Sequence, residues 1–463
     1  VGGGRPRVRM IPGRLRAVRI LRPPGIRPRS GSRSAHLTEN GMSTSLFIVV
    51  VVVVTALVFD FTNGFHDSSN AMATSVATGA FTPRRAVVVA AMLNVLGAML
   101  STEVARTISH GMFNDALIEA APEMVFAGLA GAILWNLATW LFGLPSSSSH
   151  ALFGGLIGAV IMAAGIQGVH WGTVISKIIL PAVVAPCVAG TASALATWIA
   201  YRIARPTDRF GQTIFRNGQR ISASMVALAH GTSDGQKTMG VITLVLVAAG
   251  YQEAGTGPHW WVIGAAGLAI GLGTYSGGWR IMRTMGKGLV HIDPPQGFAS
   301  ETASTVAILA SSHLGFALST THICTGSILG TGVGRGAKVS WGTFGKMGIA
   351  WLITLPCAGI VGAVTSLIAV EGGAVGTAAV IVLLLVGAWV IIRQAGHNRV
   401  DFSNVNDADS VVVAKQHDPE LGRAPKTFNE VKKEFVGTAA TTSTSAATTA
   451  TTTSVPLRKE TVA

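Results

Sequence analysis

Long apolar runs, broken at a few places by short polar clusters, dominate the chain. A helix that crosses a membrane needs about 20 predominantly apolar residues. The pattern predicts such segments at 45–80 (interrupted at 60–70), 86–103, 124–142, 145–163, 173–201, 221–249 (interrupted at 230–237), 260–280, 298–313, 318–333, 341–369 and 374–393. We interpret 145–163 and 318–333 as re-entrant hairpins or half-helices, because both are short and begin with hydroxyl residues. The pattern therefore predicts an all-α, polytopic membrane protein with about 10–12 transmembrane helices and two re-entrant hairpins.

The polar clusters form two matched pairs. Asn-Gly-Phe-His-Asp at 63–67 corresponds to His-Gly-Thr-Ser-Asp at 230–234, which lies 167 positions later. Gly-Leu-Pro-Ser-Ser-Ser-Ser-His at 143–150 corresponds to Gly-Phe-Ala-Leu-Ser-Thr-Thr-His at 315–322, which lies 172 positions later. We therefore assign a first transmembrane repeat to 42–201 and a second to 221–395. Duplicated halves with interrupted apolar segments are typical of inverted-repeat secondary transporters.

The composition fits a membrane protein. Hydrophobic residues make up 49% of the 463 positions and charged residues 12%, whereas soluble domains carry about 25% charged residues. Of the net charge of +14, residues 1–41 supply +9, because they contain ten Arg and one Glu. This basic segment has neither interleaved aromatic residues nor a core, so we exclude nucleic acid as a partner.

Both ends of the chain differ from the apolar body. Residues 1–41 bury too little apolar surface to fold, so we expect them to be disordered, with the true start at Met42. Residues 396–463 turn polar and low in complexity, which predicts a disordered tail. The three cysteines have no metal-ligand spacing, and we predict no metal site from them.

Positive charge indicates the orientation in the membrane. The predicted loop at 202–220 holds five Arg and one acid, and 280–293 holds three further basic residues before its Asp. Two predicted spans separate these stretches, so they share a face. Since basic loops stay in the cytoplasm, we assign that face to the cytoplasm.

The two hydroxyl runs are candidates for binding an oxyanion. A helix N-terminus leaves unpaired N–H groups and a partial positive charge, which together attract anions. Hydroxyls occupy three matched positions in both halves, where they would cap a helix or bond the ligand. The alternative is ordinary capping and helix–helix contact. These hydroxyl residues are Ser147, Ser148 and Ser149 in the first half and Ser319, Thr320 and Thr321 in the second.

The aspartates in the other motif pair are candidates for binding a cation. An ionisable group at the centre of a bilayer costs about 2.5–3.5 kcal/mol or more, so Asp67 and Asp234 require partners. Gly64 and Gly231 would let the helices unwind and free carbonyls to bind a small cation. An anion beside two carboxylates needs cations between them, which favours cation-coupled transport. Asp60 has no matched acid, since position 227 is Ala, and both capping and cation binding stay open for it.

Other polar residues border these motifs. His66 and His230 are candidates for a proton relay, because imidazole titrates near neutral pH, and packed histidines are the alternative. Lys237 would attract the anion, pair with an acid or extend to the membrane surface. Glu301 precedes an apolar run, where a capping box explains it as well as cation binding does.

Together the four motifs resemble the inorganic phosphate transporter family, of the low-affinity bacterial type. The resemblance covers about 55–345. It implies an inverted-repeat helical fold that moves phosphate with sodium, or moves protons or neutral metal–phosphate. It also implies that Asp67, Asn70 and Asp234 bind the cation and that the hydroxyl runs bind phosphate. Two departures are Ser233, where the family usually has Asn, and Ala317, where it usually has Pro; the second is expected to loosen the second hairpin.

We therefore predict a secondary active transporter, not an enzyme, which imports inorganic phosphate or metal-phosphate by cation symport across the plasma membrane. We expect the coupling cation to be H⁺ or Na⁺. If the substrate is metal-phosphate, a divalent metal is transported together with phosphate, and no other cofactor is expected. Membrane lipid is a partner, and self-association is left open. The candidate residues are Ser147, Ser148, Ser149, Ser319, Thr320, Thr321 and Gln236 for phosphate; Asp67, Asn70, Asp234, Asn63 and Glu301 for the cation; and His66 and His230 for protons. The alternatives are a sulfate permease on the same scaffold and, more remotely, a membrane-embedded serine hydrolase.

Overall fold

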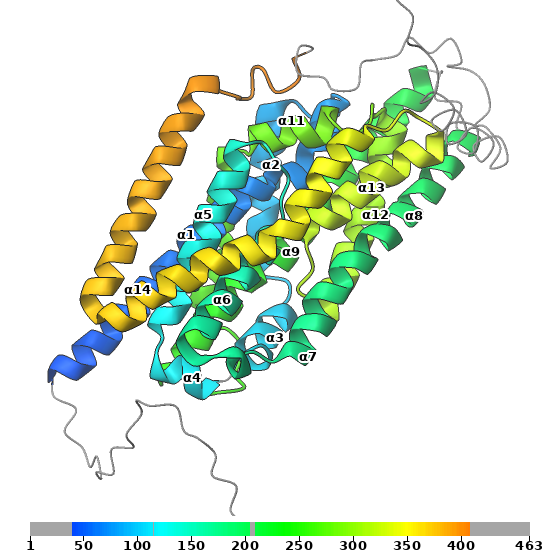
Figure 1. The fold of residues 1–463 in the computed structure, drawn as a ribbon. Coiled ribbons are helices and arrows are strands. Elements are labelled where there is room, and N and C mark those ends of the chain that lie inside the picture. Colours follow the sequence, from blue (N-terminus) through cyan, green and yellow to red (C-terminus); the bar gives the residue numbers. More distant parts are fainter. Residues whose placement is uncertain (1–38, 114, 204–208, 408–463) are drawn as a thin grey trace, which may run out of the picture. The chain divides into compact units, whose positions relative to one another are not determined.

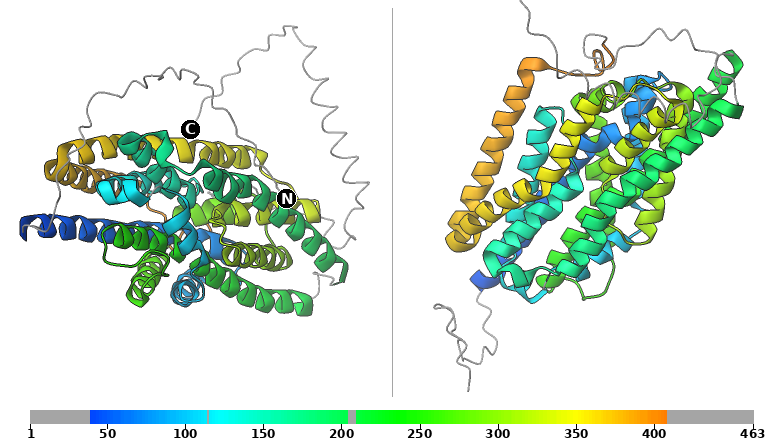
Figure 2. Two further views of the ribbon diagram at one scale, coloured as in Figure 1. Left: turned by 90° about the horizontal axis from the view of Figure 1, so that it is seen from below. Right: turned by 45° about the vertical axis from the view of Figure 1, so that its right-hand side comes forward.

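The computed structural model describes residues 39–113, 115–203 and 209–407, and almost all of them are helical. Within these ranges the only strand-like pairings are two isolated bridges, Phe113 with Val169 and Val290 with Val339. The helices, shown in Figures 1 and 2, are α1 (Glu39–Ala77), α2 (Pro83–Ala98), α3 (Glu103–Gly111), α4 (Asp115–Ala120), α5 (Glu123–Leu141), α6 (Ser148–Ala164), α7 (Trp171–Val174), α8 (Leu180–Ile203), α9 (Arg209–Ala248), α10 (Trp260–Ser276), α11 (Trp279–Lys287), α12 (Pro294–His313), α13 (Thr320–Arg335) and α14 (Trp341–Ala395).

The chain divides into the units Val1–Thr44 and Ser45–Ala463. Of the first unit, only the helical residues 39–44 are described. The following paragraphs concern the second unit, from residue 45 onward.

The helices confirm the predicted class, an all-α polytopic membrane protein. By length and composition, four helical segments in the described part are able to cross a membrane: Leu46–Ala77, Glu123–Leu141, Trp171–Ile203 and Trp341–Ala395. The number is five if the bent pair α2–α3 is counted as one further span. The last segment is two helices, because Gly373 has non-helical backbone angles and the chain changes direction there (Figure 1). The total of 10–12 spans stays a prediction.

The two aspartate motifs lie within continuous helices, so the predicted interruptions at 60–70 and 230–237 were wrong. Helix α1 runs through the first and α9 through the second. A Cβ atom on Gly64 would lie 2.2 Å from the carbonyl oxygen of Ile270, and one on Gly231 would lie 2.3 Å from that of Asn94. These glycines therefore allow α10 and α2 to approach closely, rather than allowing the helices to unwind.

The segments 145–163 and 318–333 each form one short helix, α6 and α13, and each helix makes a hairpin with the helix that precedes it. Helix α5 turns back into α6 and α12 turns back into α13, and each pair of helices packs together. Both turns begin with a glycine in the left-handed region, Gly143 at φ 63° and Gly315 at φ 67°. The turns share their backbone hydrogen bonds: Ser146 N–H donates to Leu144 at 2.8 Å, and Leu318 N–H donates to Phe316 at 2.9 Å. The turn with Ala317 thus has the same geometry as the turn with Pro145, and the expected loosening is not seen.

The two halves exchange their last helices. Helix α8 of the first half packs on the α12–α13 hairpin, and α14 of the second half packs on the α5–α6 hairpin (Figure 2). A Cβ on Gly158 would lie 1.9 Å from the oxygen of Gly359, and a Cβ on the matched Gly330 would lie 2.0 Å from that of Gly190. This reciprocal packing supports the interpretation of the chain as two related repeats, and it brings the two hydroxyl runs together.

The basic segments lie on one face, although the predicted loop is mostly helix. Helix α8 continues to Ile203 and α9 starts at Arg209, so only residues 204–208 of the segment 202–220 fall outside the described residues. The Arg220 Nε atom donates to the oxygen of Ala80 at 2.8 Å, and Lys287 Nζ donates to that of Ala77 at 3.1 Å. Both basic stretches therefore lie at the C-terminal end of α1, as expected, while the assignment of this face to the cytoplasm stays a prediction.

The first part of the predicted tail is packed against the helices. Val405 is buried, and Arg283 Nη2 donates to the oxygen of Asn404 at 2.7 Å. The expectation of disorder was therefore wrong for 396–407. The rest of the tail, 408–463, and most of the basic segment, 1–38, lie outside the described residues.

The close approach at Gly231 predicts the effect of the smallest substitution there. We expect Gly231→Ala to destabilise the folded protein by about 1–3 kcal/mol, because the new methyl group would overlap α2. Thermal unfolding of the detergent-solubilised protein measures this. The matched control is Gly264→Ala in α10, where a Cβ meets no atom within 4 Å. Equal unfolding temperatures for the two variants would contradict the proposed close contact.

Candidate functional site

The polar motifs of both halves converge at the hydroxyl of Thr320, the first residue of α13. Its Oγ1 atom lies 3.5 Å from Asp67 Oδ2 on α1 and 3.4 Å from Asp234 Oδ2 on α9. All three side chains are buried. A single hydroxyl thus lies between two carboxylates that are far apart in the sequence.

Asp67 has partners from both hydroxyl runs. Ser148 Oγ, in the first turn of α6, donates to Asp67 Oδ2 at 2.6 Å, and Thr321 Oγ1 donates to Asp67 Oδ1 at 3.4 Å. The neighbouring His66 places its Nδ1 atom 2.6 Å from Asp67 Oδ1. The Asp67 carboxylate is therefore stabilised by three groups that come from α1, α6 and α13.

Asp234 forms a buried ion pair with Lys237. Lys237 Nζ lies 2.5 Å from Asp234 Oδ1 and also 2.5 Å from Ser149 Oγ. His230 Nε2 lies 3.4 Å and Asn63 Nδ2 3.5 Å from Asp234 Oδ2. The lysine is fully buried, so of its three open roles extension to the membrane surface is excluded. Its ammonium group connects a carboxylate to the first hydroxyl run.

The six predicted hydroxyl ligands have two different roles. Ser147 and Ser319 are N-caps, whose side chains accept from His150 N at 3.1 Å and from His322 N at 3.3 Å. Ser148, Ser149, Thr320 and Thr321 contact Asp67, Asp234 or Lys237. Asn70 Nδ2 donates to both Thr320 and Thr321, at 3.2 and 3.0 Å. The capping interpretation therefore holds for the first hydroxyl of each run, and the next two face the network.

Two predicted site residues lie in other hydrogen-bond networks. Gln236 accepts from Val104 N at 2.8 Å and donates to the oxygen of Thr232, which secures the start of α3. Glu301 accepts from Thr74 Oγ1 at 2.6 Å and from Ser222 Oγ at 2.5 Å, within a second buried cluster. The capping box of α12 uses Asp293 and Gln296 instead, so the capping interpretation of Glu301 was wrong.

The histidines flank the network. His66 Nε2 lies 3.3 Å from both Thr139 Oγ1 and Ser146 Oγ, and His230 Nδ1 lies 3.1 Å from Asn94 Oδ1. Ser146, His66 and Asp67 thus have the hydrogen-bond order of a hydrolase triad. The Ser146 hydroxyl, however, is fully buried and donates its hydrogen to Thr139 at 2.8 Å instead of to His66. This geometry does not favour the alternative of a serine hydrolase.

The continuity of α1 adds Asp60 to the site. Asp60, Asn63, Asp67 and Asn70 are spaced by three, four and three residues, so in an unbroken helix they form one polar stripe. The Asp60 carboxylate is fully buried, and its polar neighbours are Asn63 on the same helix and Thr238 on α9. Asn63 Oδ1 has no hydrogen-bond partner among the described residues. The spacing is the signal that reveals this stripe, and the assumed helix break at 60–70 concealed it.

The network has the donors of a cation site. Asp67, His230 and Asp234 each offer one ligand atom, and these atoms lie within 4.8 Å of one another. Carboxylate oxygens suit hard cations, and the imidazole also suits a proton. The helix N-termini, hydroxyls and Lys237 beside them suit an oxyanion. The arrangement is therefore able to hold opposite charges close together.

A buried network with donors for opposite charges, built from both halves of an all-α membrane protein, is typical of a solute transporter. The chain belongs to the phosphate transporter family, whose model matches residues 63–362. The family consists of transporters and not enzymes, which confirms both the resemblance and the prediction that the protein is not an enzyme.

The chain is also similar to individual phosphate transporters, both in sequence and in structure. The chain is 53% identical over 369 residues to a probable low-affinity inorganic phosphate transporter of Mycobacterium bovis, covering 79% of this chain and 88% of the relative. It is 38% identical over 325 residues to a protein of the same description from Bacillus subtilis, covering 70% and 97%. A solved structure of a protein described as the sodium-dependent phosphate transporter has a TM-score of 0.61 at 23% identity and covers 69% of this chain and 98% of its own, which shows a shared fold.

The Lys237–Asp234 pair predicts strong coupling in a double-mutant cycle. Lys237→Met is expected to destabilise the protein by about 3–5 kcal/mol, because it leaves a buried carboxylate without its counter-charge. Adding Asp234→Asn is expected to recover part of that loss. Chemical denaturation in detergent measures all four species. The control cycle uses the exposed Arg106–Glu103 pair, for which about 0–1 kcal/mol is expected. Purely additive effects at Lys237 and Asp234 would contradict a direct ion pair.

Proposed function

We propose that this protein is a secondary active transporter that imports inorganic phosphate, alone or as a metal–phosphate, by cation symport across the plasma membrane. The observation that carries the proposal is the position of Thr320, whose hydroxyl contacts both Asp67 and Asp234 at the N-terminus of a helix. The substrate named in the descriptions of the relatives supports phosphate as the transported anion.

Phosphate binds between the two helix N-termini. The first turns of α6 and α13 direct N–H groups and partial positive charge toward the network. Lys237 supplies a full positive charge, 2.5 Å from Ser149 Oγ. The hydroxyls of Ser148, Ser149, Thr320 and Thr321 give donors that bond phosphate oxygens once they leave their present partners. Because these groups come from corresponding positions in the two halves, the same site is able to open to either side of the membrane.

Coupling to a cation follows from the charges. Two unit charges about 4 Å apart repel by about 4 kcal/mol at an effective dielectric constant of 20. Lys237 offsets the charge of Asp234. Asp67 instead contacts the imidazole of His66 and the hydroxyl of Ser148, both at 2.6 Å, and neither group carries a permanent positive charge. Phosphate binding therefore requires a further cation or proton at Asp67. The affinities for phosphate and for this cation are then thermodynamically linked.

A proton is the favoured coupling ion. The His66–Asp67 contact places an imidazole 2.6 Å from a carboxylate, and imidazole and carboxylate are the side-chain groups that proteins most often use to take up and release protons. The related solved structure is that of a sodium-dependent transporter, and Asp67 together with His230 and Asp234 also has the donors for a metal ion. Sodium and a metal–phosphate complex are accordingly the alternatives that transport measurements must separate.

Sulfate is the alternative substrate. Both anions suit helix N-termini and hydroxyl donors, but sulfate carries no proton near neutral pH. Phosphate is able to donate its remaining hydrogen to a buried carboxylate such as Asp67 or Asp234, which supports phosphate over sulfate.

The first functional prediction concerns Thr320. We expect Thr320→Ala to weaken phosphate uptake about 10- to 100-fold in apparent affinity, because the lost hydrogen bond to a charged ligand is worth about 1.5–3 kcal/mol. Uptake of labelled phosphate into proteoliposomes measures this, with excess unlabelled sulfate as a specificity test.

Thr302→Ala is the matched control, since the Thr302 hydroxyl is exposed and donates to its own helix at Phe298. We expect it to transport phosphate normally. An unchanged affinity in Thr320→Ala would remove the hydroxyl runs from the substrate site, and full competition by sulfate would favour the sulfate permease.

The second functional prediction concerns coupling. Asp67→Asn and Asp234→Asn are each expected to abolish accumulation of phosphate against its gradient, because the amide lacks the negative charge that attracts a cation and does not take up a proton. Uptake is measured with a pH gradient and a sodium gradient imposed separately. We expect the wild type to respond to the pH gradient.

The control for charge removal is Glu371→Gln, which alters an exposed acid on α14 and is expected to leave accumulation intact. The symport mechanism fails if both Asp→Asn variants still accumulate phosphate, or if the wild type accumulates it with no ion gradient. A response to sodium alone would keep symport and replace the proton with sodium.

A further inference from the structure

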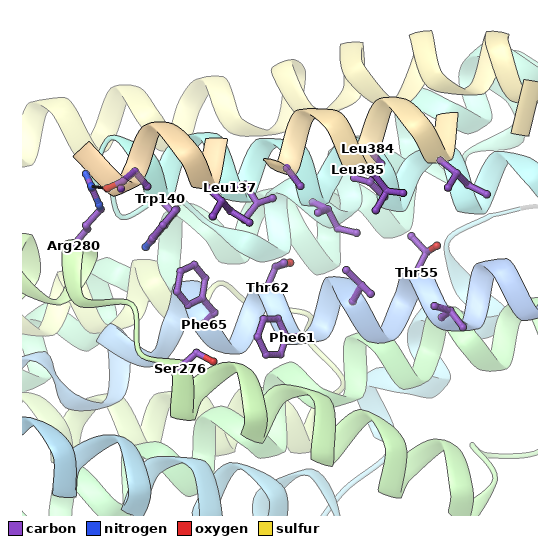
Figure 3. Close-up of a pocket in the computed structure, with 18 of the residues that line it drawn as sticks. Thr55, Phe61, Thr62, Phe65, Leu137, Trp140, Ser276, Arg280, Leu384 and Leu385 are labelled. Atoms are coloured by element: carbon purple, nitrogen blue, oxygen red, sulfur yellow. Dashed lines mark hydrogen bonds between the residues drawn. The ribbon is translucent and has the colours of Figure 1, made fainter. Parts of the chain in front are cut away.

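A large apolar cavity lies between α1, α5 and the C-terminal part of α14 (Figure 3). Its volume is about 780 Å³, which falls within the range of about 300–1,000 Å³ typical of small-molecule sites. Val54, Val58, Phe61 and Phe65 of α1 line it. These residues recur at helical spacing and lie on the opposite side of α1 from the stripe of Asp60, Asn63, Asp67 and Asn70. The cavity is therefore separate from the candidate transport site.

The body of the cavity suits hydrocarbon. Figure 3 shows Leu384 and Leu385 of α14 facing α1 across it. Its hydroxyl residues donate to carbonyl oxygens of their own helices, Thr55 to Val51 at 2.7 Å, Thr62 to Phe59 at 2.8 Å and Ser276 to Leu272 at 3.1 Å. No hydroxyl hydrogen in this set is directed at a ligand, so the middle of the cavity favours an apolar chain.

One end of the cavity is basic. Arg280, beside Trp140 in Figure 3, donates to the oxygens of Leu141 at 3.1 Å and Ala395 at 2.7 Å, which hold its guanidinium at this end. Arg399 also lines the cavity and is exposed. Among the described lining residues there is no Asp or Glu. The nearby Asp401 interacts with Arg399, but its Oδ1 atom accepts from the backbone and hydroxyl of Ser403.

We propose that this cavity binds one acyl chain of an anionic phospholipid, whose phosphate lies at Arg280 and Arg399. An apolar cavity with two guanidinium groups at one end is complementary to a hydrocarbon chain attached to a negative headgroup. The basic end also lies on the face that the arginine-rich segments assign to the cytoplasm, where anionic lipids are concentrated. The proposal stands on the cavity and its charges and does not depend on the transported substrate.

Native mass spectrometry of the full chain, titrated with phosphatidylglycerol or phosphatidylcholine, tests the headgroup. We expect one phosphatidylglycerol to bind saturably and more tightly than phosphatidylcholine. Arg399→Gln is expected to weaken phosphatidylglycerol about fivefold, the equivalent of about 1 kcal/mol per basic residue near a lipid headgroup, and to leave phosphatidylcholine unchanged. The matched control is Arg393→Gln, since Arg393 is exposed, lies over Trp389 and does not line the cavity.

The acyl chain is tested by filling the cavity. Leu384→Trp is expected to remove the bound phosphatidylglycerol, whereas Leu383→Trp, on the same helix but outside the lining, is expected to retain it. The proposal is overturned if no saturable site exists, if the two lipids bind equally or if Arg399→Gln behaves as Arg393→Gln does. It is also overturned if Leu384→Trp dissociates an oligomer while lipid stays bound, which would identify a second copy of the chain as the occupant. Arg399→Gln changes an exposed side chain, so the test stands even if Leu384→Trp fails to fold.

Discussion

The burial of two carboxylates inside a membrane protein is the constraint on which the rest of the structure depends. Each ionised group costs about 2.5–3.5 kcal/mol or more at membrane depth, so it persists only with partners. Lys237 offsets Asp234 directly, and His66 with Ser148 surrounds Asp67. Thr320 of the second repeat contacts Asp67 of the first, and Asn63 of the first contacts Asp234 of the second, so each carboxylate has a partner in the other repeat. The two halves are therefore held together by the charges that also make the site able to bind a cation and an anion.

Close helix packing makes this convergence possible. Glycines occur where one backbone meets another, as at Gly64 against Ile270 and at Gly330 against Gly190. In an apolar solvent helices gain little from excluding hydrophobic surface, so tight van der Waals contact between small residues carries much of the association. The exchange of α8 and α14 between the halves uses such contacts, and it places the N-termini of α6 and α13 against the two aspartates.

Helix α1 separates two environments. One face carries the polar stripe that ends in contacts with the hydroxyl runs, and the opposite face lines an apolar cavity with arginines at one end. The same helix thus connects the proposed lipid site to the proposed transport site without a shared residue.

The sequence by itself determined the membrane class, the duplication and most of the residues of the network, and its four motifs resemble the family to which the chain belongs. The class and the duplication follow from composition and spacing, which a membrane protein must satisfy locally because every span needs its own apolar length and paired backbone. The tertiary structure decided whether the helices break at Gly64 and Gly231, since that depends on the helix packed against each glycine. It also decided that Ser147 is a cap, that Gln236 secures α3 and that Lys237 pairs with Asp234. These roles depend on distances between residues remote in the chain, and no local pattern contains them.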